Sequence, residues 1–403
     1  MSPTNPMEST LMKTAYLSRG RLFLADGEHP HQLVESAFAR EVKQRAVEIQ
    51  QRHGWKSKGS ESGFMTQGQD LWNVRRMDQE AIPIRITGVS RGFVPGEILY
   101  TLQTETVGGL FRYIVSEDRE IRLFHKESFR VEDPTPHPNG EWVAACLRFA
   151  NGTSNLMVVP KDRPLIDELT EGDSRDEAPA WVPGPGRKLV FQSTGVARNE
   201  AGFARGMAPS TIQFLDVETG KMETLLEDGH FDFLSPQMDA QGNLYAIRRP
   251  FEEPGVKKAG IKDVVVDTIL LPFRLFRALI HFLDFISKMF SQKPLVKSGG
   301  VGVRGTTEDE ERGVWIRGKY LEIAKASSAQ EEDAKSWVPD NWELVKKASG
   351  GALEVLAKSV VSFDLTTKGV PGYTDGKAIY RLGSKGFEKI GKAKFMEKLA
   401  LLD

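Results

Sequence analysis

The chain has 403 residues, with 54 basic and 55 acidic side chains and a formal net charge of −1. This balance gives no general attraction to nucleic acid or to an anionic membrane, so no nucleic-acid partner is expected. The single cysteine, Cys146, excludes an intramolecular disulfide, and no uncharged apolar run reaches the ~18 residues of a conventional membrane-spanning helix.

The N-terminal part combines a hairpin with a helix. Residues 14–17 and 21–25 have the composition of two strands, and the turn between them contains Gly20. The period then changes: Ser36 can cap a helix whose apolar residues recur every three or four positions. We therefore expect a helical excursion over 36–54 that lies on the surface of the domain.

Short strands with turn residues between them fill the region from about 81 to 250, and three phrases in it are similar. Each has a proline, a turn that ends in glycine and a short apolar strand; their marker residues are Asp133, Pro136, Asp176, Pro179, Trp181 and Pro236. The prolines Pro136, Pro179 and Pro236 recur 43 and 57 residues apart. This spacing is typical of one four-stranded blade, so it predicts an all-β propeller of about six blades over 10–403.

These phrases resemble the repeat of TolB-type propellers (the PD40 repeat), which reads roughly D-x-x-P-x-W-S-P-D-G. The phrase from Asp176 through Pro179 and Trp181 matches best, whereas the first has His137 where the aromatic is expected and the third lacks the tryptophan. The resemblance implies a propeller closed by strands from both chain ends. It also implies that the marker residues are structural rather than catalytic.

After Pro254 the strand pattern stops, and it resumes near 359. We expect a mainly helical insertion over 256–352 inside a late blade. Its most distinctive part is 262–290, an amphipathic segment with a very apolar surface and a narrow charged stripe. The candidate docking residues on this segment are Phe273, Arg274, Phe276, Arg277, Ile280, Leu283 and Ile286.

Three interpretations of 262–290 remain open from the sequence. The segment can pack on the rest of its own chain, dock on a partner protein, or lie in a membrane interface as a peripheral contact. Acidic residues on the charged stripe, Asp267 and Asp284, argue mildly against an anionic bilayer.

The sequence has no G-x-S-x-G, P-loop, dinucleotide fingerprint or H-E-x-x-H motif. We therefore predict no catalytic residue, no cofactor and no metal site. Acidic residues before the blade starts, Asp133, Asp173, Asp176 and Asp232, are expected to cap turns. In the alternative hypothesis such acids meet in the central channel and hold a metal, as in propeller lactonases.

Residues 1–19 contain no apolar segment of the kind found in signal peptides. The functional expectation is thus a cytoplasmic, bacterial and non-enzymatic protein. It would be a protein–protein interaction scaffold that docks on a protein partner, or associates with a membrane, through 262–290. The alternative is a metal-dependent, lactonase-like hydrolase.

Overall fold

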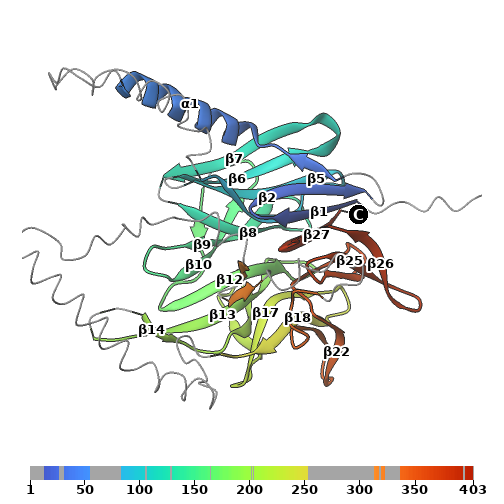
Figure 1. Cartoon of the computed structure of the whole chain (residues 1–403). Helices are drawn as coiled ribbons and strands as arrows, with labels where there is room; N and C mark the ends of the chain where they lie inside the picture. Colours follow the sequence, from blue (N-terminus) through green and yellow to red (C-terminus); the bar gives the residue numbers. More distant parts are fainter. Residues whose placement is uncertain are drawn as a thin grey trace, which may run out of the picture. The chain divides into compact units, whose positions relative to one another are not determined.

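The computed structural model describes residues 13–26, 31–54, 83–104, 107–127, 129–163, 165–200, 202, 204–252, 313–316, 319–322, 336–393 and 395–402. The chain divides into two compact units, of which the first comprises Met1–Phe251 and Asp333–Asp403 and the second Glu252–Glu332. Strands dominate the described residues of the first unit, with one long helix (Figure 1). The predicted all-β class is therefore confirmed.

The strands of the first unit form antiparallel groups of four. The group that contains both chain ends has the order β27-β1-β2-β3, with β27 Lys398–Leu402, β1 Lys13–Ser18, β2 Arg21–Asp26 and β3 Gln32–Val34. The next group has the order β4-β5-β6-β7, with β4 Arg85–Arg91, β5 Glu97–Gln103, β6 Val107–Ile114 and β7 Arg119–Glu127. A short 3-10 turn, Val115–Glu117, precedes β7.

Two further groups are joined in a nine-stranded sheet. One consists of β8 Arg130–Pro136, β9 Trp142–Arg148, β10 Ser154–Pro160 and β11 Asp167–Glu168. The other consists of β12 Ser174–Trp181, β13 Lys188–Arg198, β15 Thr211–Asp216 and β16 Met222–Leu226, and β14 Ala204–Met207 pairs with the far end of β13. One parallel residue pair, Ser154 with Arg175, connects them.

The last two groups come from the C-terminal part. They are β17 Phe231–Met238, β18 Leu244–Pro250, β21 Glu343–Lys347 and β22 Leu353–Lys358, then β23 Ser362–Leu365, β24 Pro371–Thr374, β25 Ala378–Gly383 and β26 Gly386–Lys392. In the second unit, β19 Gly313–Ile316 and β20 Lys319–Glu322 form a hairpin, and Lys319 pairs with Glu252 at 2.8 Å.

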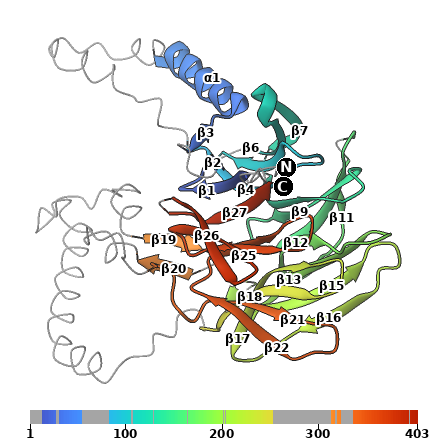
Figure 2. The same cartoon turned by 90° about the vertical axis from the view of Figure 1, so that its right-hand side faces the viewer.

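The first strands of the groups pack on one another in a closed order. β4 lies against β8, β8 against β12, β12 against β17, β17 against β23, β23 against β27, and β27 returns to β4. Both ends of the chain share the group that completes this order, because β27 pairs with β1 along its length (Figure 2). We call β4, β8, β12, β17, β23 and β27 the inner strands.

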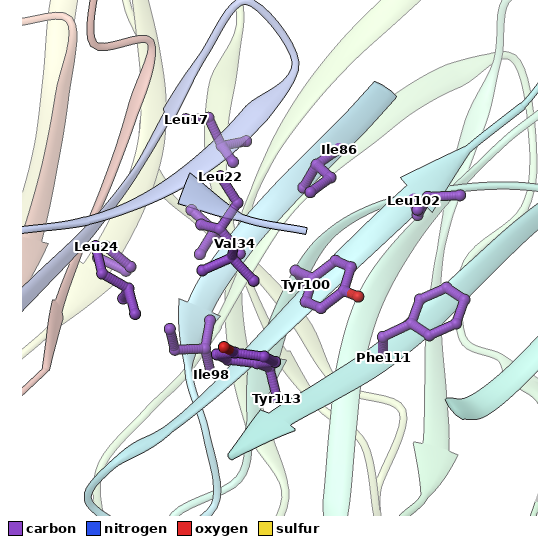
Figure 3. Close-up of a cluster of buried hydrophobic side chains, with 13 residues drawn as sticks. Leu17, Leu22, Leu24, Val34, Ile86, Ile98, Tyr100, Leu102, Phe111 and Tyr113 are labelled. Atoms are coloured by element: carbon purple, nitrogen blue, oxygen red, sulfur yellow. The ribbon is translucent and has the colours of Figure 1, made fainter. Parts of the chain in front are cut away.

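Apolar side chains from neighbouring sheets fill the spaces between them. Figure 3 shows one such cluster, in which Leu17, Leu22 and Leu24 of the N-terminal hairpin face Ile98 and Tyr100 of β5. All of these side chains are at least nine-tenths buried. Successive side chains of a strand point to opposite faces of its sheet. Each sheet therefore presents apolar residues on both faces, and neighbouring four-stranded sheets can pack face to face.

The helix α1, Ala37–Gly54, begins on this cluster and then points away from the strands (Figures 1 and 2). The Ser36 Oγ accepts a hydrogen bond from the Ala39 amide at 3.1 Å, which is the N-cap arrangement. The Glu120 carboxylate accepts from the amides of Ala37 and Phe38 at 3.1 and 3.0 Å. The first turn is thereby fixed on β7, while the exposed Arg40, Gln44 and Arg45 follow it.

The insertion ends earlier than the sequence suggested. The third strand of its sheet is β21, Glu343–Lys347, which pairs with β18, so the predicted bound of 352 is wrong. Trp342 and Leu344 are fully buried, and an exposed Gly350–Gly351 turn follows them, so this stretch is a hairpin arm. The apolar–polar alternation of β21 is short and ends in two lysines, so the sequence analysis includes this strand in the insertion.

Candidate functional site

The candidate docking residues from Phe273 to Ile286 lie outside the described residues. The blade-motif residues are all described and lie on three inner strands. Asp133 and Pro136 are on β8, Asp176, Pro179 and Trp181 are on β12, and Pro236 is on β17. The three phrases thus correspond to successive starts of four-stranded groups.

A β-bulge interrupts each of these three strands at the same place. Asp133, Ala178 and Ser235 have left-handed backbone angles, with φ of 52°, 51° and 51°. Each stands where the pairing register shifts, and each is followed by a proline. The bulges therefore set Pro134, not Pro136, level with Pro179 and Pro236. The sequence alignment placed the first phrase two residues too late because it followed the spacing from aspartate to proline.

Trp181 ties β12 to β8. Its indole Nε1 donates to the Thr135 carbonyl at 3.0 Å, and the ring of His137 meets it edge-on with centroids 4.6 Å apart. Both rings are more than nine-tenths buried. Trp181 is thus a contact between neighbouring groups of strands, which fits a structural role for this marker.

Charged side chains on or beside the inner strands pair across the closed order. Lys398 of β27 pairs with Asp133 of β8, and Arg91 of β4 lies 3.4 Å from the carboxylate of Asp364 on β23. Arg91 also donates to the Leu365 carbonyl. We define the polar belt as Arg91, Glu132, Asp133, Arg148, Arg175, Glu177, Asp364 and Lys398.

Glu177 is the most connected member of the polar belt. Its Oε1 accepts from Arg148 Nη2 and Arg175 Nη2, each at 2.6 Å, and its Oε2 accepts from Gln192 Nε2 at 3.0 Å. Burial acts to raise the pKa of Glu177, but the guanidiniums of Arg148 and Arg175 outweigh it and hold this pKa below its ordinary value. The side chain is therefore an ionised, fully occupied carboxylate.

Glu132 behaves in the opposite way. It shares Arg148 with Glu177, through a contact of 3.3 Å between Glu132 Oε2 and Arg148 Nε. Burial raises the pKa of Glu132 above its ordinary value, and Arg148 opposes this only in part. Two carboxyl groups with opposite pKa shifts thus flank one guanidinium.

Hydrogen bonds to the backbone complete the connections between inner strands. Asp364 Oδ2 accepts from the Leu401 amide at 2.9 Å, and Ser362 Oγ accepts from the Leu399 amide at 3.1 Å, so β23 holds β27. Gln237 Oε1 accepts from the Leu365 amide at 2.9 Å and joins β17 to β23.

Two more contacts extend this pattern. Thr87 Oγ1 donates to the Val131 carbonyl at 3.0 Å between β4 and β8, and Gln192 Oε1 accepts from the Ser235 amide at 2.9 Å. The polar groups at the inner strands are thus engaged in holding neighbouring groups together.

The other predicted acids have separate roles. Asp176 accepts from Ser193 Oγ at 2.7 Å, and Asp173 pairs with Arg198 at 2.5 Å. Asp232 accepts from the Ser210 amide at 2.9 Å and pairs with Arg249 at 3.0 Å. Within the ranges that the structure describes, no group of three or more His, Cys, Asp or Glu side chains could hold a metal ion.

Sequence reasoning missed most of the polar belt. Arg91, Arg148, Arg175 and Lys398 belong to no motif. Arg175 pairs with Glu177 two positions away, but Arg91 and Lys398 have partners 273 and 265 positions away in the sequence. The one local signal was Lys398, a charged residue in a strand that is otherwise apolar. The closed order of the inner strands is what brings Lys398 to Asp133 and Arg91 to Asp364.

The chain was compared with known proteins. No protein-family model and no curated protein matches it. Among solved structures it is similar to TolB from Acinetobacter baumannii, with 11% identity and a TM-score of 0.48 over 97% of this chain and 66% of that one. It is also similar to a chain of a nidogen/laminin complex, with 8% identity and a TM-score of 0.50 over 97% and 98% of the two chains.

A third similar structure is the tricorn protease, with 12% identity and a TM-score of 0.45 over 94% of this chain and 33% of that one. At these identities the likeness concerns the fold alone. TolB structures are thus among those that the chain is similar to, as the repeated phrases predicted. In the part of the chain that is described, no helix is long and apolar enough to cross a membrane.

Proposed function

We propose that this protein is a six-bladed propeller that serves as a non-enzymatic scaffold for protein–protein interaction. Each four-stranded group counts as one blade in this proposal, and the closed order of the inner strands supports the count of six. The proposal includes a cytoplasmic location, which rests on the sequence alone.

The observation that carries the proposal is the occupancy of the polar belt. Asp133, Glu177 and Asp364 each face a lysine or an arginine from another strand. Glu177 uses both of its oxygens in these contacts. Side chains held in this way stiffen a ring and offer no free acid or base to a substrate. A stiff ring suits a protein that presents surfaces to partners.

The apolar segment 262–290 is the second docking element of the proposal. Its support is sequence alone: on a helix, Phe273, Phe276 and Ile280 would belong to an apolar surface larger than a soluble monomer usually exposes. The proposed occupant is a protein partner, and contact with a membrane surface is the alternative to be tested beside it.

The test is a deletion with boundaries taken from the fold. Joining Phe251 to Ser336 removes the second unit and keeps two anchors of the first. These are the Ser336 Oγ, which donates to the Asp375 carbonyl at 2.7 Å, and the buried Trp337 against Gly376. We expect the shortened chain to fold and to lose partners that cross-link to the full chain in its host.

A matched variant separates docking from folding. In the full chain, Phe273→Ser with Phe276→Ser should remove the same partners and leave the thermal unfolding midpoint of the propeller unchanged. Retention of every partner by both variants would contradict the role of 262–290. If the deletion variant does not fold and the double variant is destabilised, we would conclude that the segment packs on its own chain.

The hydrolase alternative meets a physical obstacle in the polar belt. Arg148 stands between Glu132 and Glu177, where a bound cation would need to be. A metal at that point would have to displace a guanidinium that makes two ion pairs. Turnover of lactone or peptide substrates that depends on Glu132 and on an added divalent metal would overturn the scaffold proposal.

A further inference from the structure

The outer edge of the last group of strands carries lysines that the fold does not use. Lys385, Lys389 and Lys392 are exposed on β26 and on the turn before it. Among the described residues none forms an ion pair with any of the three. We call these three residues the basic edge.

Several basic residues near other strand edges have partners within the described part of the chain. Just before β16, Lys221 pairs with Glu223, and at the start of β7 Arg119 lies 3.0 Å from Glu117. Lys347 of β21 donates to the Leu225 carbonyl at 3.0 Å. Glu388, the acidic residue within β26, stands opposite Arg381 of β25, so the hairpin that carries the basic edge keeps an excess of positive charge.

Half-buried aromatic side chains form an apolar bed beside the basic edge, and two of them, Tyr373 and Phe387, also pack on the neighbouring core. Tyr373 and Tyr380 stack with centroids 4.9 Å apart, and Phe387 meets Tyr373 edge-on at 4.9 Å. Lys389 stands opposite Tyr380 in the register of β25 and β26, and Phe387 stands opposite Leu382, which is 37% exposed. Residues opposite each other, or two apart along a strand, share one face of a sheet, so Lys389 borders this bed.

The backbone of β26 is also open. This strand is the last in its sheet, so its second side pairs with no described strand. Its seven residues give a row of about 23 Å at the usual rise of a strand. A bulge at Ile390 limits regular pairing to the stretch from Gly386 to Lys389.

We propose that the basic edge and its apolar bed bind an acidic polypeptide segment in extended conformation. This inference rests on the proposed scaffold function and names the chemistry of one partner. A linear row of ammonium groups along a strand fits a linear row of carboxylates, and an extended partner can also add main-chain hydrogen bonds at an open edge. Lysines at an edge prevent two copies of the chain from pairing there, because their like charges repel. An acidic strand meets no such repulsion and can pair with the edge.

The test uses the full chain and a labelled twelve-residue peptide of alternating Glu and Thr, with fluorescence anisotropy as the readout. We expect binding that weakens at least ~10-fold between 50 and 300 mM salt, because exposed charges are screened. The triple variant Lys385→Glu, Lys389→Glu and Lys392→Glu should lose this binding. A peptide of alternating Lys and Thr should not bind the native chain.

A control variant with the same change in net charge isolates the site. Arg40→Glu, Lys43→Glu and Arg45→Glu on α1 should bind the acidic peptide within ~2-fold of the native chain, because steering by net charge alone is a weak effect at moderate salt. Near-ultraviolet circular dichroism and the unfolding midpoint show whether each variant is folded. Equal loss in both triple variants, or no binding by the native chain, would overturn the inference.

Two further probes distinguish the class of partner. Vesicles containing phosphatidylserine and a single-stranded oligonucleotide are offered to the same variants. Tighter binding of either than of the peptide, abolished by the β26 variant, would overturn the assignment to a polypeptide. Failure of the peptide while host partners still cross-link to the chain would leave the scaffold proposal standing and remove only this inference.

Discussion

The charged side chains of the inner strand β12 and of the outer strand β26 lie in opposite environments. On the inner side Glu177 serves two arginines and a glutamine and is about nine-tenths buried. On the outer side Lys389 is exposed and makes no ion pair with a described residue. Both residues lie in strands, where side chains alternate between the two faces. This alternation alone does not distinguish a charged residue that joins neighbouring sheets from one that faces water.

The largest effect should come from removing the centre of the polar belt. Glu177→Ala leaves Arg148 and Arg175 without their shared carboxylate. Because the Arg148 side chain is 35% exposed, we expect a loss of about 3 kcal/mol of unfolding free energy, at the low end for a buried pair. Urea denaturation measures it. The control is Glu218→Ala on an outer turn, where the carboxylate is 57% exposed and lies 3.9 Å from Arg187. Equal effects of the two substitutions would abolish the distinction between inner and outer charges.

The next effect concerns the strand that completes the ring. Asp364→Ala removes the acceptor of the Leu401 amide and the partner of Arg91, and should lower the unfolding free energy by about 2–3 kcal/mol. Asp364→Asn keeps one acceptor oxygen and should recover part of that loss. If Asn and Ala are equally harmful in urea denaturation, the hydrogen bond to β27 is not what Asp364 supplies.

The two glutamates that flank Arg148 should give opposite pH dependences. The folded-state pKa of Glu177 is lowered, so its contribution is complete above the unfolded value of about 4.5 and is lost as pH falls through the folded value. The folded-state pKa of Glu132 is raised, so the native chain loses stability as pH rises from 4.5 through that value.

Unfolding free energies at pH 4 and pH 7 check this contrast. The native chain should gain stability relative to Glu177→Gln as pH rises, and lose stability relative to Glu132→Gln. Shifts of the same sign in both variants would mean that the environments of Glu132 and Glu177 have been misassigned.

A smaller effect is expected at the start of α1. Ser36→Ala removes the N-cap acceptor of the Ala39 amide and should cost about 1 kcal/mol. Ser36→Thr should retain most of the capping. Circular dichroism at 222 nm during thermal unfolding reports the effect, and identical curves for the native chain and the Ala variant would exclude a capping role.

The smallest effect should be at the basic edge. Lys389→Ala is expected to change the unfolding free energy by less than about 0.5 kcal/mol, as for most exposed positions. A loss well above that value in urea denaturation would show that Lys389 supports the fold. That result would argue against the proposal that the exposed lysines of β26 are available to bind a partner.

Much of the fold was accessible from the sequence, because blade starts repeat locally. Proline, glycine and alternating apolar residues predicted the strands that follow the phrases, which are β13 and β18. The strands β12 and β17, which carry Pro179 and Pro236 themselves, were not predicted. The β-bulge at Asp133 could not be placed from the sequence. The residues with left-handed backbone angles before the three prolines are Asp133, Ala178 and Ser235, so no residue type recurs at this position. β21 was missed because its arm is short and rich in lysine, although Trp342 and Leu344 are buried.

The polar belt was far less predictable. Arg91 and Asp364 are 273 positions apart, and no local pattern links them. Their meeting depends on the closed order of the inner strands, which is a property of the whole chain. Lys398, the one charged residue in the apolar strand β27, was the available signal, and the sequence does not show that its partner is Asp133.

The central claim is that the inner strands form one closed ring in which β27 and β1 are integral. Native-state hydrogen exchange of the β1 and β27 amides tests it most directly. The claim predicts that these amides exchange with the same opening free energy as those of β8 and β9, because the ring opens only as a whole. Exchange of β27 through a local opening, at clearly lower free energy while β8 and β9 stay protected, would contradict it.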